Sequence, residues 1–331
     1  MKDEKISCRH CGSFDVVKKG VRKLASGKRQ IYLCKDCSHR FSNGLNKKRF
    51  NAWLIVDAVC SYNNGYSYEE VCELISRKYK INIGKSSIER WVKQYNLGYL
   101  DIRDKIVWKY GKKLIVERMF NHSGLVYNFK LHRGKLREYG KFIGLKNFIS
   151  DVSKGIDDRI FNGNGERCSQ SKGNIYVNTK KTFRSFLVPK KCFKHFLCVN
   201  GSENQRLNKV IGEMLKIVKD NHSRHSLVEN LMLCCDRDTL AVEVPVWYWD
   251  RKFNKGICGH IDVIQVKFGK IWILDYKPHA EKENFEKVVS QLYNYALAVY
   301  FRTGVLLTEI KCGWFDCVKT FSFNPLEVKV R

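Results

Sequence analysis

Four successive apolar residues, Ile271 to Leu274, lead directly into Asp275, Tyr276 and Lys277. A run that is apolar on both faces is typical of a strand covered on both sides, so this segment predicts a strand at the centre of a sheet. Successive side chains of a strand point to opposite faces, so Asp275 and Lys277 share one face while Tyr276 points away. The chain is therefore expected to build a sheet that presents a carboxylate and an ammonium group together.

The neighbouring segments predict the rest of this sheet. Residues 240–249 and 257–266 are strand-like and are separated by a polar turn, while a helix is expected over 285–301 and another strand over 309–317. With a leading helix, the order is helix, three strands, helix, strand (αβββαβ). If Asp262 ends the antiparallel neighbour of the Asp275 strand, the two carboxylates can meet and hold Mg²⁺ or Mn²⁺. Lys277 would then orient or activate an attacking water.

The spacing of an acid and a lysine two residues apart is not specific by itself. It recurs at Asp3/Lys5, Glu309/Lys311 and Glu327/Lys329. The Asp275 segment differs because it follows an acidic strand and precedes a long amphipathic helix. This context selects Asp275 and Lys277.

This arrangement resembles the PD-(D/E)XK nuclease superfamily, and the closest likeness is to its RecB-like exonuclease branch. That branch has a G-x-x-D strand, a D-Y-K strand and a helix with Q-x-x-x-Y. The matching residues here are Gly259, Asp262, Asp275, Tyr276, Lys277, Gln291 and Tyr295. The resemblance covers residues 206–331 and implies a restriction-endonuclease-like α/β core, a mixed sheet flanked by helices, that cleaves phosphodiesters.

The same resemblance implies a role for each matching side chain. Asp262 and Asp275 would bind the catalytic Mg²⁺ or Mn²⁺, and Lys277 would polarise water. Gln291 and Tyr295 are four residues apart, so they share a helix face and would position the substrate strand or the lysine. The alternative is a surface ion pair between Asp275 and Lys277 on an edge strand, with the helix pair capping a core.

The first acidic position of the family has several candidates on the leading helix. Glu213 follows a glycine that permits close approach to the sheet, and is slightly favoured over Glu229, which lies nearer to the first strand. Some RecB-like members use histidine at this position, so His222 and His225 are further candidates. On the first strand, Glu243 is either a further acidic site residue or an exposed strand position.

Two pairs of cysteines near the N-terminus predict a metal site of another kind. Cys8 and Cys11 form one C-x-x-C pair, and Cys34 and Cys37 form the second. Each pair can present two thiolates to one ion, and two pairs complete a tetrahedron, so a structural Zn²⁺ in a zinc ribbon is expected. A disulfide is disfavoured because no secretory signal is seen.

The other cysteines are expected to be ordinary buried thiols. Some RecB-like nucleases carry an iron–sulfur cluster bound by one upstream cysteine and three late ones. The cysteines considered for it are Cys192, Cys198, Cys312 and Cys317, but only two of them lie late, so such a cluster is disfavoured.

Residues 47–97 predict a helix-turn-helix. Helices are expected over 51–62, after a Ser67–Glu70 capping box, and over 88–95 with Ser86 or Ser87 as its N-cap. The polar side chains expected to face DNA are Ser86, Ser87, Arg90, Lys93 and Gln94. Together with the ribbon, this region resembles the N-terminus of several insertion-sequence transposases. The alternative is a three-helix protein-interaction module.

The charge of the chain favours nucleic acid as its partner. The formal net charge is +28, of which +11 lies in residues 1–97, +13 in 98–205 and +4 in 206–331. A positive field of this size neutralises phosphates and releases counterions, which supplies affinity without sequence information.

The predicted protein is thus a multidomain α+β enzyme. The expected domains are a zinc ribbon (1–46), a helix-turn-helix (47–97), a basic middle region of unknown fold (98–205) and a nuclease (206–331). The expected function is a metal-dependent deoxyribonuclease of a mobile element or virus, acting on DNA in the cytoplasm or nucleoid. A homodimer is left open, and no membrane association is expected. The alternative function is a DNA-binding transcriptional regulator or transposase accessory protein with a degenerate nuclease fold.

Overall fold

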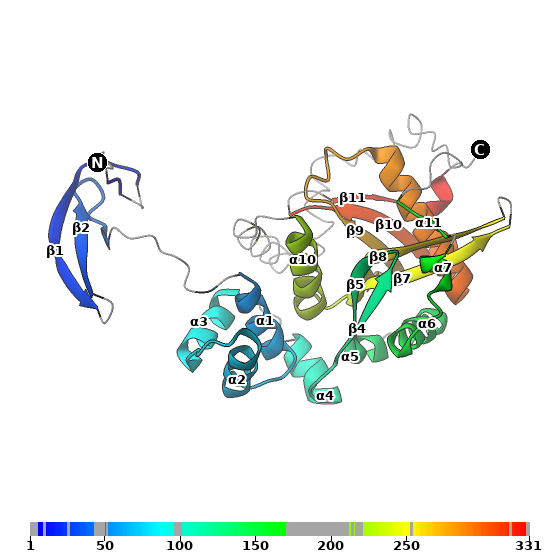
Figure 1. Ribbon diagram of the computed structural model, residues 1–331, viewed down its shortest axis with the longest axis horizontal. Coiled ribbons are helices and arrows are strands. Elements are labelled where there is room, and N and C mark those ends of the chain that lie inside the picture. Colours follow the sequence, from blue (N-terminus) through cyan, green and yellow to red (C-terminus); the bar gives the residue numbers. More distant parts are fainter. Residues whose placement is uncertain are drawn as a thin grey trace. The chain divides into compact units, whose positions relative to one another are not determined.

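The protein is a mixed α+β structure that divides into two compact units, residues 1–51 and 52–331 (Figure 1). The computed structural model describes residues 6–8, 11–24, 27–42, 50, 52–95, 101–138, 140–163, 165–169, 212, 215, 221–251, 254–317 and 320–328.

The first unit is a small antiparallel sheet of β1 (Val16–Leu24), β2 (Gly27–Cys34) and β3 (Arg40–Ser42). Its buried apolar cluster is formed by Cys8, Tyr32, Cys34 and Phe41. The rings of Tyr32 and Phe41 stack with centroids 5.8 Å apart. A core of this size cannot stabilise an independent fold without a further constraint, such as a bound metal.

The second unit begins with three helices, α1 (Ala52–Asn63), α2 (Tyr68–Tyr79) and α3 (Lys85–Tyr95). The predicted capping box is present at the start of α2, where Ser67 and Glu70 exchange side chain-to-backbone hydrogen bonds. The predicted N-cap of the third helix is wrong. Because α3 begins at Lys85, Ser86 and Ser87 lie inside its first turn.

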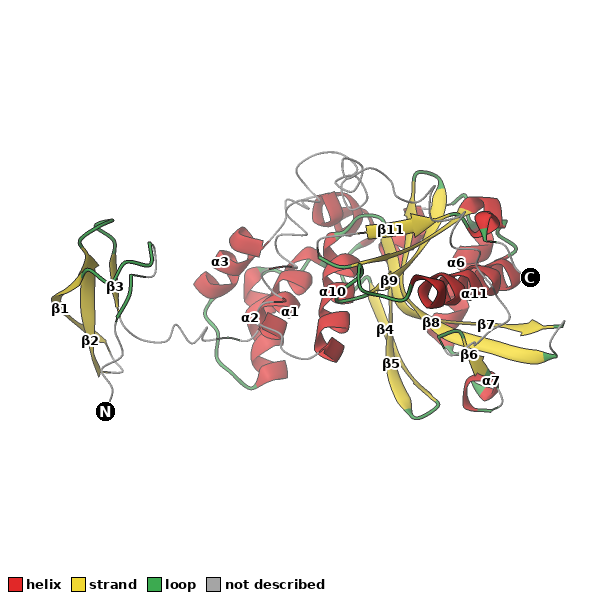
Figure 2. Cartoon of the chain, turned by 90° about the horizontal axis from the view of Figure 1, so that it is seen from above, coloured by secondary structure: helices red, strands yellow, loops and turns green. Residues whose placement is uncertain are grey.

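The large sheet follows the element order predicted for the C-terminal part. Along the chain come α10 (Asn221–Cys235), β7 (Thr239–Asp250), β8 (Lys255–Lys267), β9 (Lys270–Tyr276), α11 (Phe285–Thr303) and β10 (Ile310–Phe315). The sheet order is β11-β10-β9-β8-β7-β5-β4, so β9 is central as expected. It runs antiparallel to β8 and parallel to β10, and β11 (Thr320–Phe323) forms an edge (Figure 2). Short 3₁₀ helices occupy Leu307–Glu309 and Pro325–Glu327.

Strands from residues 98–205 complete the same sheet. β4 (Ile115–His122) and β5 (Leu125–His132) form a hairpin beside β7, and β6 (Glu166–Arg167) pairs in parallel with β8. The helical segments of this region are Asp101–Val107, a π-helix, then α4 (Trp108–Tyr110), α5 (Arg133–Glu138), α6 (Ile143–Lys154) and α7 (Arg159–Asn162). Where the structure describes it, the middle region is thus part of the large sheet rather than a separate body.

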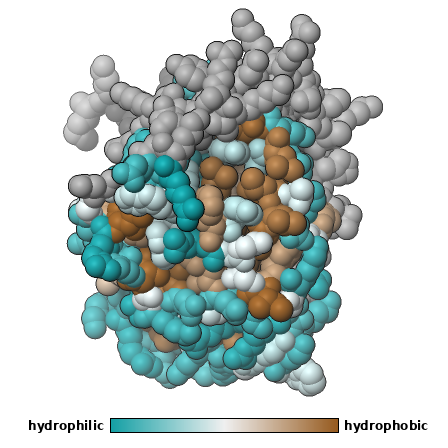
Figure 3. Space-filling model, turned by 90° about the vertical axis from the view of Figure 1, so that its right-hand side faces the viewer, coloured by the Kyte–Doolittle hydropathy of each residue, from teal (hydrophilic) through white to brown (hydrophobic). Residues whose placement is uncertain are grey.

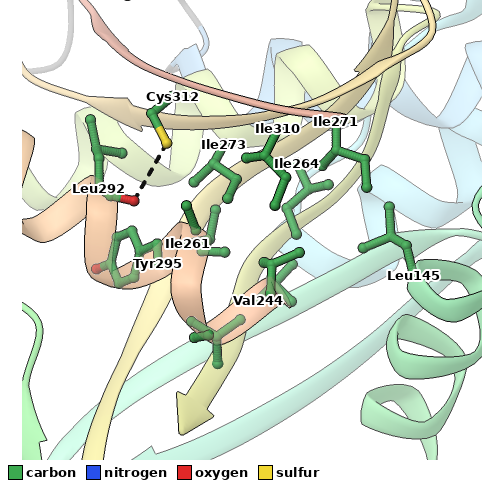
Figure 4. Close-up of a cluster of buried hydrophobic side chains, with 14 of the residues drawn as sticks. Leu145, Val244, Ile261, Ile264, Ile271, Ile273, Leu292, Tyr295, Ile310 and Cys312 are labelled. Atoms are coloured by element: carbon green, nitrogen blue, oxygen red, sulfur yellow. Dashed lines mark hydrogen bonds between the residues drawn. The ribbon is translucent and has the colours of Figure 1, made fainter. Parts of the chain in front are cut away.

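The main core lies between this sheet and the helices α6 and α11. Val244, Ile261 and Ile273 from three strands pack with Leu292 of α11, and all four are fully buried (Figure 4). Leu145 of α6 belongs to the same cluster. The alternating apolar positions of the strands and the apolar stripe of α11 therefore hold the sheet in place.

The surface of the second unit is mixed in character. Exposed apolar side chains such as Trp249 and Phe301 reach solvent, and Figure 3 shows apolar residues between hydrophilic ones on one face. Scattered apolar side chains of this kind are normal for a protein surface. No described helix has both the length and the apolar character of a membrane span.

A buried lysine fastens the middle region to the C-terminus of α10. Lys135 is fully buried, and its Nζ donates hydrogen bonds to the carbonyls of Leu233, Asp236 and, at 3.1 Å, Thr239. Carbonyls at a helix C-terminus lack intrahelical partners and carry partial negative charge. Lys135 satisfies them, although burial lowers the pKa of its ammonium group.

Replacing Lys135 tests whether these hydrogen bonds stabilise the fold. Lys135→Met is expected to lower the free energy of unfolding by roughly 2–4 kcal/mol, because three buried carbonyls lose their donor. The control is Lys154→Met, whose lysine is exposed and forms a surface ion pair with Asp151. Urea denaturation followed by circular dichroism measures both. Equal stability of the two variants would contradict this role for Lys135.

Candidate active site

Three carboxylates stand in one row across the middle of the large sheet. Continuing the registers of β7 with β8 and of β8 with β9 places Glu243 across from Asp262, and Asp262 across from Asp275. Like charges directly across neighbouring strands repel each other. The sheet therefore concentrates negative charge at this level, and a cation would relieve the repulsion.

Both sheet pairings are locally distorted at this row. Asp262 lies in the middle of β8, so the expectation that it ends the strand is wrong. Its Oδ2 accepts a hydrogen bond from the backbone N–H of Tyr276 at 2.8 Å, a donor that is not engaged by the β8 backbone. Glu243 has a φ of 50°, a left-handed conformation that costs a non-glycine residue about 1 kcal/mol or more. Such strain is often found where a side chain is held for function.

Helix α10 adds two further groups to the row. Glu229 is 3% exposed, and its Oε1 has no hydrogen-bond partner among the described residues. His225 lies one turn earlier, with Nδ1 3.6 Å from Asp262 Oδ2. Ligand atoms of His225, Glu229 and Asp262 all lie within 4.8 Å of one another.

The structure thus brings two of the candidates for the first acidic position to the site, Glu229 and His225. Glu213, which the sequence slightly favoured, lies outside the described residues, as does the side chain of His222. Glu243 lines the same cavity as Asp262 and Asp275, so its alternative placement as an exposed strand residue is wrong.

The end of β9 and helix α11 hold the lysine in place. Lys277 Nζ lies 2.7 Å from Asp275 Oδ2, and Gln291 Nε2 donates to Asp275 Oδ1 at 3.2 Å and to the Tyr295 hydroxyl at 3.0 Å. Asp275 is 1% exposed on a central strand, so the alternative of a surface ion pair on an edge strand is wrong. At Gly259 a Cβ would lie 2.6 Å from the Tyr295 ring, which explains the glycine.

Burial and mutual repulsion make these acids hold protons. Burial, with the neighbouring Asp262 carboxylate, raises the pKa of Asp275 to about 7 and that of Glu243 to about 8. Burial, with Glu243 and Asp262, raises the pKa of Glu229 well above its usual range. Against burial, the carboxylates of Asp275 and Asp262 raise the pKa of Lys277. The lysine therefore stays charged while the acids resist ionisation.

These residues fit a divalent cation. Glu229 Oε1 is a buried oxygen that finds no partner in the described part of the chain, and it lies beside His225 and Asp262 with ligand spacing. Mg²⁺ and Mn²⁺ prefer oxygen ligands, above all carboxylates, and a cation would also neutralise the repelling acids. Asp275 and Glu243 line the same cavity and can serve as further oxygen ligands.

The cavity continues beyond the acids into groups that the sequence did not indicate. Its ≈ 200 Å³ is also lined by His122, Tyr127, Arg167 and His260. His260 lies two residues before Asp262 on the same strand, and this spacing is the only local sequence signal that could have indicated any of the four. The others come from the middle region and arrive by strand pairings that have no local sequence signature.

The four N-terminal cysteines form a second candidate metal site, in the first unit. Cys8 and Cys37 have their sulfurs 3.6 Å apart, those of Cys11 and Cys34 are 3.5 Å apart, and all four lie within 4.8 Å of one another. A tetrahedral Zn²⁺ with bonds of about 2.3 Å requires sulfurs about 3.8 Å apart. The group can therefore hold a metal such as zinc.

The cysteines considered for an iron–sulfur cluster are not brought together in the described part. Cys312 is buried, with Sγ 3.5 Å from the carbonyl of Leu292, and Cys317 is half-buried. Neither belongs to a metal-ligating group among the described residues. Cys192 and Cys198 lie outside those residues.

Helix α3 presents the residues predicted to face DNA. Ile88, Trp91 and Val92 are buried, so the helix has an inner face as expected. Ser86, Arg90, Lys93 and Gln94 are exposed, and Ser87 is half-buried.

The raised acid pKa values predict how the stability of the metal-free protein depends on pH. A carboxyl with a raised folded pKa binds its proton more tightly in the folded state, so its contribution to stability is full below about pH 4 and is lost as pH rises toward 8. The melting temperature in EDTA should therefore fall over this window. Mn²⁺ should restore it, and restore more at pH 8 than at pH 5.5.

The control for this prediction is Asp275→Asn, which removes one titrating acid and should flatten the fall. Differential scanning fluorimetry at several pH values measures both proteins. A melting temperature in EDTA that rises from pH 5.5 to 8, or a Mn²⁺ effect independent of pH, would contradict the acid cluster.

Comparisons with family models, with curated proteins and with solved structures give no match to the chain.

Proposed function

We propose that the protein is a deoxyribonuclease that hydrolyses phosphodiester bonds with Mg²⁺ or Mn²⁺. The observation that carries this proposal is one buried cluster, in which Glu229, Glu243, Asp262 and Asp275 gather beside Lys277. A stable fold does not gain from four acids placed together in a low-dielectric site. Their placement is accounted for by a cation and an anionic substrate.

The order of elements and the matching residues support a RecB-like PD-(D/E)XK core as the setting. In that setting Glu229 takes the first acidic position, with Asp262 and Asp275 on the second and third strands. Gly259, Gln291 and Tyr295 then occupy the remaining positions of the pattern. Tyr295 lies against Gly259 and accepts a hydrogen bond from Gln291.

Each side chain of the site has a physical task in this reaction. Glu229 and Asp262, with His225, would hold the cation, which when bound supplies positive charge to the phosphate and lowers the pKa of water. Lys277 keeps its proton and directs Nζ–H donors at the negative charge that develops on the phosphate. Asp275 orients that ammonium group, and Gln291 and Tyr295 hold Asp275.

The rest of the chain supports DNA as the substrate. The positive charge is concentrated in residues 1–205, outside the acidic site. Exposed Arg90 and Lys93 on α3 and a zinc-bound first unit would grip or choose the DNA, as a helix-turn-helix and a zinc ribbon do.

Substitutions at the cluster test the proposal. Asp275→Asn, Lys277→Met and Glu229→Gln should each lower Mg²⁺-dependent cleavage by roughly a hundredfold or more, because each removes charge that acts on the transition state. DNA affinity should change little. Supercoiled plasmid and linear DNA, incubated with Mg²⁺ or with EDTA, report the activity and distinguish cutting within the strand from loss at the ends.

The matched control is Lys311→Met, at the same spacing from Glu309 but on β10, outside the cavity-lining residues. It should cleave like the native protein. If the three cluster variants cut as fast as the native protein, the site is not catalytic and a DNA-binding regulator becomes the better account.

A further inference from the structure

The half of the cavity away from the acids contains Arg167, which has no acidic partner among the residues that the structure describes. Arg167 is half-buried on β6, and its only described hydrogen bond is a long one, 3.3 Å from Nη2 to the Ser123 carbonyl. Among the described residues Arg167 forms no ion pair, whereas the neighbouring Glu166 forms an ion pair with Lys255. Most of the five guanidinium donors are therefore available to a ligand that enters the cavity.

Arg167 is placed at a distance from the reacting phosphate. It pairs in register with Cys258, which is four residues before Asp262 on β8, or about 13 Å of strand. A guanidinium at that level suits an anion other than the phosphate held at the acids. In a nucleic acid strand the next anion is a neighbouring phosphate.

A packed block of rings forms the wall beside Arg167. His122 stacks on Phe161 with centroids 4.0 Å apart, Tyr127 stacks on His260 at 3.5 Å, and His122 Nδ1 lies 2.9 Å from His260 Nε2. His122 is 2% exposed, yet none of the described residues forms a hydrogen bond with its Nε2. Buried polar atoms are almost always paired, so this nitrogen is suited to a ligand group.

The His122 imidazole and the Arg167 guanidinium have different tasks. Burial lowers the pKa of His122, so its ring offers a neutral hydrogen-bonding group, while Arg167 supplies the positive charge.

We propose that this half of the cavity is a subsite for a nucleotide next to the scissile bond, in which Arg167 binds the phosphate and His122 Nε2 hydrogen-bonds the sugar or base. The proposal rests on the proposed nuclease function. The subsite is fixed before substrate arrives, because the β4–β5 turn is tied to α7 by Ser123, whose N–H donates to Asn162 Oδ1 at 2.7 Å.

The test combines an arginine variant with a neutralised phosphate. Kinetics are measured on a short single-stranded DNA oligonucleotide that carries one methylphosphonate, an uncharged linkage, at each position in turn. Arg167→Gln should raise KM by roughly tenfold to a hundredfold with a smaller change in kcat, as expected when a charged hydrogen bond is lost. In the native protein, a methylphosphonate at one position should raise KM by a similar factor. In Arg167→Gln the same methylphosphonate should raise KM no further, because the interaction is already lost.

Two more variants separate binding from structure. Arg167→Lys keeps a positive charge and should recover part of the lost affinity at that one position. Arg159→Gln removes an exposed arginine that is already paired with Asp157, and should match the native protein at every position.

The outcomes distinguish this subsite from the nuclease itself. Suppose that cleavage depends on Asp275, but that each methylphosphonate lowers kcat/KM by the same factor in Arg167→Gln as in the native protein. The subsite is then refuted, while the nuclease function is supported. If the native protein does not cleave, the same comparison is made on Kd with Ca²⁺ present. If one methylphosphonate weakens binding by the native protein but not by Arg167→Gln, the subsite is supported even though the nuclease function is not. If no position behaves in this way, the subsite is refuted.

Discussion

The burial of neighbouring carboxylates that also repel one another is the constraint on which the rest of the structure depends. Burial, with the Asp262 carboxylate, raises the pKa of Asp275 from 3.8 to about 7, which corresponds to a cost on the order of 4 kcal/mol when Asp275 ionises. The apolar core between the sheet and α11 must hold the acids together against this cost. A bound divalent cation would remove this cost, so the arrangement that weakens the metal-free fold would also give the site affinity for a metal.

The acids of the site come from several different elements of the fold. Neighbouring strands supply Glu243, Asp262 and Asp275 through sheet register, and α10 supplies Glu229. Helix α10 is itself held at its C-terminus by Lys135, which donates to the Leu233 carbonyl, and it contacts α1, where Asn63 Nδ2 donates to the Cys234 carbonyl at 3.4 Å. The helix that carries Glu229 therefore packs against α1, and α1 packs in turn against α3, the helix proposed to face DNA.

The parts that could be predicted from the sequence are those encoded by local periodicity. The apolar run before Asp275 predicted a central strand, and the alternation of side chains placed Asp275 beside Lys277. The helical spacing of Gln291 and Tyr295 likewise predicted their contact. These features depend only on residues near one another in the chain.

The remaining parts depend on long-range pairings that no local pattern encodes. Asp262 lies inside its strand rather than at the end, because the β7–β8 hairpin runs past the site. The choice of Glu229 depends on how α10 packs across the sheet. His122 and Arg167 enter from strands that join the sheet from the middle region, where the sequence showed no motif.

Locating a bound cation tests the account most directly. Crystals grown with millimolar Mn²⁺, measured at the manganese absorption edge, should give an anomalous peak about 2.1 Å from carboxylate oxygens of Glu229 and Asp262. The peak should disappear in Glu229→Gln crystals. Well-ordered native crystals without a peak between α10 and β8, or with manganese bound only elsewhere, would contradict the claim that these acids form a metal centre.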